Sequence, residues 1–186
     1  MRKVLFLFGQ LNDDDIEWML KAGRKRAVQA GEVLIRQGVP VDAVFILLEG
    51  NLAVWLQPRK GPERELARLQ AGEIVGEMSF VDARPPSATV KAVTDSTIFA
   101  LPKAVLTAKL TADPGFAARF YRALAIYLST TVRERHRALG YGGGGASEPE
   151  ELEDEEDADE LDVNVLDGVY LAGERFDRMV KRVLVA

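Results

Sequence analysis

The sequence predicts an α+β protein in which about eight antiparallel strands form a jelly-roll-like β-roll, flanked by an N-terminal helix and a long C-terminal helix. Two patterns carry this prediction. The middle of the chain consists of short apolar runs, each long enough for one strand, separated by Gly31, Gly38, Gly50, Gly61 and Gly72. Glycines between β-rich runs are typical of antiparallel hairpins. After Pro114 the apolar residues recur every three or four positions instead, which predicts a long helix.

A short amphipathic helix begins the predicted fold. Asn12 has the side chain of an N-cap residue, and Asp15 follows three positions later in the first turn. Gly23 ends the segment. The apolar residues at helical spacing are Leu11, Ile16, Met19 and Leu20.

Six of the predicted strands are placed on apolar runs of the sequence. They are EVLIRQG over 32–38, AVFILLEG over 43–50, NLAVWLQP over 51–58, RELARLQAG over 64–72, TVKAVT over 89–94 and STIFALP over 96–102. Each has the length and apolar content of one strand.

Two helices are predicted after the strands. Pro102 fits the first turn of the earlier helix, and the second runs from Pro114 to about Leu139, where Gly140 ends it. Its apolar stripe consists of Phe116, Phe120, Ala123, Leu124, Tyr127, Leu128 and Val132, and Arg119, Arg122, Arg133 and Arg137 lie off the stripe. Such a stripe must cover another apolar surface, so we expect that two copies of the chain could pair through it as a homodimer.

The formal net charge of -5 is unevenly distributed. Residues 1–146 carry 20 Lys and Arg against 15 Asp and Glu, whereas residues 147–162 carry 11 acids and no base. We therefore predict a first domain over 1–139, a glycine-rich and then acidic disordered linker over 140–162, and an amphipathic C-terminal segment over 163–186.

The C-terminal segment is predicted to be a helix with one apolar face, formed by Phe176, Met179, Val180, Val183 and Leu184. A face this apolar needs a partner. The tether is long enough to return the helix to its own barrel as a lid, to a second copy, or to another protein. All three remain open, and we expect the face to bind a partner.

Composition excludes several kinds of site. The chain has 0 Cys and 1 His, His136, so thiolate metal sites, disulfides and cysteine nucleophiles are excluded. No phosphate-cradling P-loop or nucleophile with a base is present, which indicates that the protein is not an enzyme. The opening residues lack a cleavage site and no segment is long and apolar enough for a membrane span, so we expect a cytoplasmic protein.

Four segments, in order and at consistent spacing, resemble the cyclic nucleotide-binding domain, a sensor fold similar to that of the catabolite activator protein. They are AGEVLIRQG, VFILLEGNLAV, LQAGEIVGEMSF and SATVKA. The resemblance covers about Leu11 to Leu139 and implies a short helix inside AGEIVGEMSFVDARPPSATVKA. It also implies a nucleotide-binding loop formed by Gly76, Glu77, Met78, Ser79, Arg84, Ser87, Ala88 and Thr89.

The resemblance implies that Glu77 accepts a hydrogen bond from the ribose hydroxyl of the nucleotide. It also implies an arginine at the position directly before Ser87, which would bind the cyclic phosphate. The residue before Ser87 is Pro86. Proline supplies neither positive charge nor a backbone N–H. Loss of one member of a buried charge pair costs roughly 2–5 kcal/mol. Arg84 lies two residues upstream, but Pro85 and Pro86 restrict the backbone between them.

These observations favour a non-catalytic regulatory or scaffold module that has lost its nucleotide and acts through a protein partner. The alternative is a sensor that binds cAMP or cGMP and transmits binding through its long helix. A transcription factor would need a helix-turn-helix after that helix, and the acidic linker stands there instead, so we expect no nucleic acid partner. Ser129, Thr130 and Thr131 lie where related bacterial proteins contact the base, although hydroxyl residues near a helix end are unremarkable.

Overall fold

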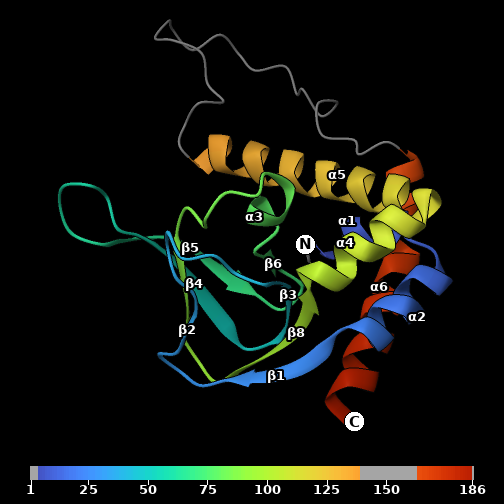
Figure 1. The fold of residues 1–186 in the computed structure, drawn as a ribbon, viewed down its shortest axis with the longest axis horizontal. Coiled ribbons are helices and arrows are strands. Elements are labelled where there is room, and N and C mark those ends of the chain that lie inside the picture. Colours follow the sequence, from blue (N-terminus) through green and yellow to red (C-terminus); the bar gives the residue numbers. More distant parts are fainter. Residues whose placement is uncertain (1–3, 139–162, 186) are drawn as a thin grey trace, which may run out of the picture.

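A computed structural model describes residues 4–138 and 163–185 (Figure 1). The helices are α1 (Val4–Gln10), α2 (Asp13–Ala22), α3 (Met78–Val81), α4 (Lys103–Ala112), α5 (Pro114–Ala138) and α6 (Val163–Val185). The strands are β1 (Arg24–Val28), β2 (Val33–Ile35), β3 (Ala43–Glu49), β4 (Asn51–Leu56), β5 (Arg64–Gln70), β6 (Ile74–Val75), β7 (Thr89–Ala92) and β8 (Ser96–Pro102). The predicted linker over 140–162 lies outside the described residues.

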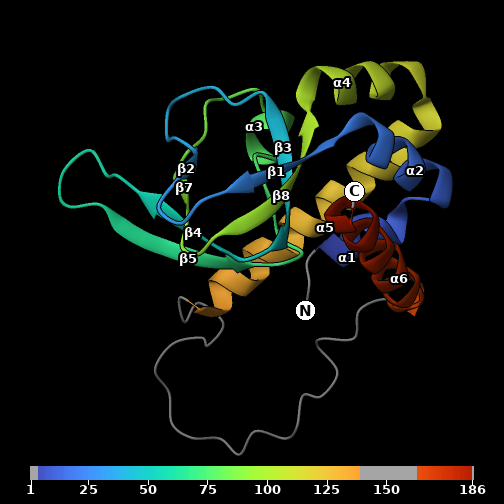
Figure 2. The same cartoon turned by 90° about the horizontal axis from the view of Figure 1, so that it is seen from below.

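The predicted antiparallel β-roll with flanking helices is confirmed. Two four-stranded sheets face each other, one in the order β1-β8-β3-β6 and the other in the order β2-β7-β4-β5. Every strand pair is antiparallel. The helices gather on one side of the roll, against the sheet that contains β3 and β8 (Figures 1 and 2).

The capping signal at the N-terminus was predicted correctly. Asn12 Oδ1 accepts a hydrogen bond from the Asp15 backbone N–H at 2.9 Å, and Asp15 Oδ2 accepts one from the Asn12 N–H at 2.9 Å. This capping box starts α2, and Gly23 ends it by donating to the Met19 carbonyl. The sequence analysis missed α1, which buries Phe6, Leu7 and Phe8.

Strand β3 separates two apolar cores. Because side chains alternate along a strand, Val44, Ile46 and Leu48 face the helices, whereas Ala43, Phe45 and Leu47 face the interior of the roll. Burial on both faces explains the continuous apolar run AVFILL in this strand.

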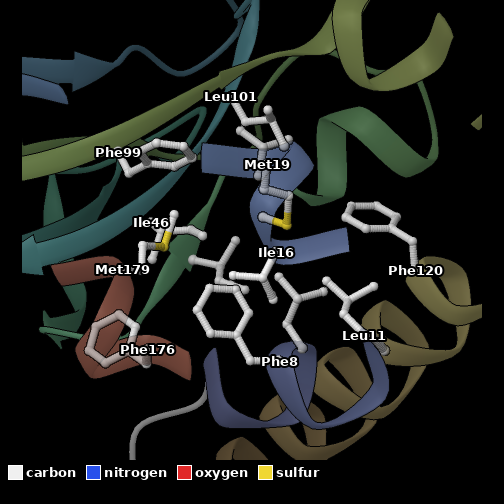
Figure 3. Packing of buried hydrophobic residues seen from close by; sticks show 14 of the residues in the cluster. Phe8, Leu11, Ile16, Met19, Ile46, Phe99, Leu101, Phe120, Phe176 and Met179 are labelled. Atoms are coloured by element: carbon white, nitrogen blue, oxygen red, sulfur yellow. The ribbon is translucent and has the colours of Figure 1, made fainter. Parts of the chain in front are cut away.

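The helix-side core joins residues that are far apart in the sequence (Figure 3). Phe8, Met19, Phe99, Phe176 and Met179 pack in one buried cluster. The rings of Phe8 and Phe176 lie 6.1 Å apart between centroids. Helices α1, α2 and α6 and strand β8 therefore share one core.

The long helix α5 uses most of its predicted stripe inside this core. Phe116, Phe120, Ala123, Leu124 and Tyr127 are buried, Leu128 is half-buried and Val132 is exposed. Most of the stripe therefore packs against the chain's own core, and the pairing of two copies through the long helix remains a prediction. Arg119 Nε and Nη2 donate to Asp15 at 2.7 and 2.9 Å.

Helix α6 lies against α1 and α2 of its own chain (Figure 2). Phe176, Met179 and Val183 are buried, and Val180 and Leu184 are half-buried. The apolar face that the sequence assigned to a partner is therefore covered by the chain's own helices in this structure. The sequence left open whether this face packs on the same chain, on a second copy or on another protein, and in this structure it packs on the same chain.

Polar contacts fix α6 at both ends of that face. Arg175 Nη1 donates to the carbonyls of Phe8 at 2.9 Å and Leu11 at 2.8 Å, and its Nε donates to Asp13 at 2.8 Å. Lys25 Nζ donates to the Leu184 carbonyl at 2.9 Å. Arg175 thus satisfies carbonyls near the end of α1 that the helix itself leaves unpaired.

Candidate functional site

The candidate site is the connection from β6 to β7, which the resemblance implied to be a nucleotide-binding loop. It starts at Gly76, whose φ is +87°. A Cβ at this position would lie 3.0 Å from the Ala43 carbonyl oxygen of the neighbouring strand β3. Both the left-handed backbone and the close approach require glycine, so the fold itself accounts for Gly76 at this position, whether or not a ligand binds.

Glu77 precedes α3 as its N-cap residue, with helical backbone angles and no side-chain hydrogen bond to the helix. The Glu77 side chain therefore does not cap the helix that follows it. Ser79 Oγ donates to the Gly76 carbonyl at 3.1 Å, and Met78 is 54% exposed. Phe80 anchors α3 to α5 through a T-shaped contact with Phe120, 6.1 Å between centroids.

Lys103 adds a cation to this loop that the sequence analysis did not single out. Its Nζ donates to Ser79 Oγ at 2.9 Å, and its backbone N–H donates to the Asp42 carbonyl at 2.7 Å. Burial lowers the pKa of Lys103, while the charges of Asp42, Asp82 and Glu77 act in the opposite direction. A lysine in the first turn of a helix opposes the helix dipole, and that conflict in α4 was a usable sequence signal.

The second half of the loop is held by its backbone. The Pro86 carbonyl accepts a hydrogen bond from the Gly38 N–H at 2.8 Å, and Thr89 Oγ1 accepts one from the Gln37 N–H at 3.1 Å. Ala83 has a φ of +56°, a left-handed conformation that is uncommon for a residue with a side chain. Thr89 is buried, and its hydroxyl oxygen is bonded to backbone.

Arg84 is exposed, and its backbone N–H donates to Asp82 Oδ1 at 3.0 Å. Ser87 is exposed and Ala88 is half-buried. Seven of the eight predicted loop residues lie on the connection between β6 and β7, and the eighth, Thr89, is the first residue of β7. At the position before Ser87, where the family places a cation, the chain presents a proline ring.

Helix α5 contacts the β6–α3 segment of the same connection. The Tyr127 hydroxyl is buried and donates to the Ile74 carbonyl at 2.9 Å, two residues before Gly76. Thr131 Oγ1 donates to the Tyr127 carbonyl at 2.9 Å, so this hydroxyl is satisfied within the helix. Ser129 is exposed and Thr130 is half-buried. Tyr127 and Phe120 therefore connect both ends of the β6–α3 segment to α5.

Neither membrane spanning nor metal binding has support in the described residues. Even the longest described helices lack a window apolar enough to cross a bilayer. Within 4–138 and 163–185, no three or more His, Asp and Glu side chains gather in a group that could hold a metal ion.

The fold and the loop together define a β-roll domain with a helix-bearing connection between its sixth and seventh strands. Residues 25–113 match the family model of the cyclic nucleotide-binding domain. The family resemblance inferred from the sequence is confirmed.

Three relatives illustrate the range of this likeness. The cAMP-dependent protein kinase regulatory subunit of Blastocladiella emersonii is 29% identical over 136 residues, which is 71% of this chain and 34% of that protein. The cyclic AMP receptor protein of Thermus thermophilus is 32% identical over 95 residues, 51% of this chain and 44% of that protein. A cyclic nucleotide-binding domain from Methylobacillus flagellatus superposes with a TM-score of 0.68 at 21% identity, covering 77% of this chain and 84% of the other. The chain thus spans less than half of the two curated relatives.

Proposed function

We propose that this chain is a non-catalytic regulatory or scaffold module whose nucleotide-binding loop no longer holds a cyclic nucleotide, and which acts through protein contacts. The observation that carries the proposal is Pro86 at the position before Ser87. A cyclic phosphate bears one negative charge, and an arginine binds it strongly because both groups are charged and several N–H donors converge on the oxygens. Proline provides none of these donors.

The surrounding geometry supports the same reading. The Pro86 carbonyl is engaged by Gly38, and Arg84 is exposed with its N–H bonded to Asp82. Moving Arg84 into the phosphate position would require a shift of two residues across Pro85, whose ring fixes the backbone. Lys103 of α4 also contacts the loop, where its Nζ is hydrogen-bonded to Ser79 Oγ and interacts electrostatically with Glu77.

Isothermal titration calorimetry with cAMP and cGMP tests this proposal on the natural protein and on Pro86→Arg. Arginine retains the backbone carbonyl, so the bond to Gly38 can persist in the variant. Restoring the charge pair should tighten binding by a factor of about 30 to several thousand. We expect no binding by the natural protein up to millimolar nucleotide, and measurable binding by Pro86→Arg.

Arg84→Gln is the matched control. Micromolar binding by the natural protein would overturn the proposal and support a cAMP or cGMP sensor. If Arg84→Gln then abolishes that binding, Arg84 is the phosphate ligand.

For the protein contact, we propose that a second copy pairs through the outer face of α5. Tyr121, Ala125, Leu128 and Val132 are spaced four, three and four residues apart, which is the spacing of a coiled-coil seam. Tyr121 and Val132 are each 50% exposed. This face shares Leu128 and Val132 with the predicted stripe but contains none of its fully buried residues.

Analytical ultracentrifugation tests the pairing. Val132→Glu should shift the chain from dimer to monomer, because it buries an unpaired charge at the seam. Val105→Glu, at an exposed position on α4, is the control and should leave the dimer intact. A natural protein that stays monomeric at high concentration would exclude this interface.

A further inference from the structure

A cavity of about 290 Å³ opens at one end of the roll, at residues that the nucleotide-binding loop does not include. Its apolar lining is formed by Ala43 and Phe45 of β3 together with Ala100 and Pro102 of β8, and its charged lining consists of Arg24, Lys25, Arg26 and Asp42. The volume is close to the lower end of the range for small-molecule sites. None of the eight predicted loop residues lines it.

Two arginines of β1 line the same cavity. Arg24 pairs with Ala100 and Arg26 pairs with Ile98 in the antiparallel register, and directly opposed residues share one face of a sheet. Ala100 and Ile98 belong to the buried core of the roll. Arg24 and Arg26 therefore extend the apolar inner face with two guanidinium groups where the roll opens to solvent.

The charges around the cavity do not cancel. Arg26 is paired with Glu32 at 2.8 Å, whereas Arg24 forms no ion pair with any acid among the described residues. Asp42 is the one acid of the lining, and its charge is also shared with Lys103. An inward-pointing charge on an edge strand discourages pairing with another chain, but that role does not require a cavity with an apolar floor beside it.

We propose that this cavity binds a small organic anion with a compact apolar body. The anionic head lies at Arg24, whose planar guanidinium suits a carboxylate or a phosphate, and the apolar body covers Phe45 and Ala100. This site is separate from the nucleotide-binding loop in both its residues and its ligand. It does not depend on whether the loop binds a cyclic nucleotide.

Sodium octanoate is a suitable probe, because it joins a carboxylate to an apolar chain, and 1-octanol has the same chain without the charge. Binding is measured by ligand-observed NMR and calorimetry with the full chain. We expect saturable octanoate binding that weakens about tenfold in Arg24→Gln, the loss of one charge-assisted contact at a partly exposed site. Octanol should bind more weakly and should not respond to Arg24→Gln.

Arg64→Gln provides the matched control, because Arg64 is an exposed arginine of β5 in the other sheet. It should bind octanoate as the natural protein does. Absence of saturable binding up to millimolar octanoate would overturn the proposal, as would an equal effect of Arg24→Gln and Arg64→Gln. Octyl phosphate in the same assay distinguishes a carboxylate site from a phosphate site.

A cyclic nucleotide titration of Arg24→Gln separates this result from the function proposed above. The variant changes only the cavity, whereas Pro86→Arg changes only the loop. Loss of octanoate binding with an unchanged nucleotide response therefore reports on the cavity alone.

Discussion

Replacement of Phe176 by alanine is a direct test of how α6 is held. The Phe176 ring is 1% exposed, contacts the Phe8 ring and lies in the same cluster as Met179. Removing a buried aromatic ring loses its transfer free energy and leaves a cavity, which costs about 3–4 kcal/mol in a well-packed core. For a chain of this size, each kcal/mol lowers the melting temperature by roughly 2–4 °C. We therefore expect Phe176→Ala to melt roughly 6–16 °C lower.

The assay is thermal and urea unfolding followed by circular dichroism, with Leu171→Ala as the control on the same helix. Leu171 is 50% exposed, so its truncation should change the free energy of unfolding by no more than about 0.5 kcal/mol. Equal stabilities for the two variants would refute the docking of α6 on α1. A melting temperature that still rises with protein concentration in Val132→Glu, the variant that disrupts pairing through α5, would show instead that α6 docks on a second copy.

Two further predictions concern ion pairs that involve the N-terminal helices. Arg119→Met should lower the free energy of unfolding in urea by about 3 kcal/mol, because Asp15 is only 4% exposed and would remain as a buried charge without its cation. Arg122→Met, at an exposed position on α5, is the control. Equal effects of the two substitutions would contradict the reasoning. Low pH should weaken the contact between α6 and α2. The hydrogen bond from Arg175 is the largest cause that lowers the pKa of Asp13 below its usual 3.8, and the positive charge of Arg175 is the next. The Asp13–Arg175 pair contributes its full stability above the pKa that Asp13 has in the unfolded chain. That stability is lost as the pH falls through the lower pKa that Asp13 has in the folded chain. With Asp13 62% exposed, the loss is about 0.5 kcal/mol, and it should be absent from Asp13→Asn in acid unfolding monitored by fluorescence.

The strands and the long helix could be predicted because their signals are local. Gly50 and Gly72 occur at turns with positive φ, and the runs between such glycines have the length of single strands. The capping box at Asn12 and Asp15 is likewise contained in four consecutive residues. These features depend on the backbone and on neighbouring side chains, which a sequence displays directly.

The packing of α6 against α1 and α2 could not be predicted, because the sequence shows the apolar face of α6 but not the residues that contact it. Phe176 and Met179 needed a partner, and the partner includes α1, whose residues precede them by more than 150 positions. The short apolar run at the N-terminus was not predicted to form a helix. Once it is recognised as a helix with buried Phe6, Leu7 and Phe8, the two unmatched apolar surfaces satisfy each other.

The loop shows a similar limit at the level of single residues. The missing cation at Pro86 could be read from spacing, but Lys103 could not be connected to Ser79 because 24 positions and two strands separate them. Gly76, Ser79 and Tyr127 all have roles that hold β6 and α3 in place without a ligand. Their presence therefore does not argue for nucleotide binding, and Pro86 becomes the position at which the two functional readings diverge.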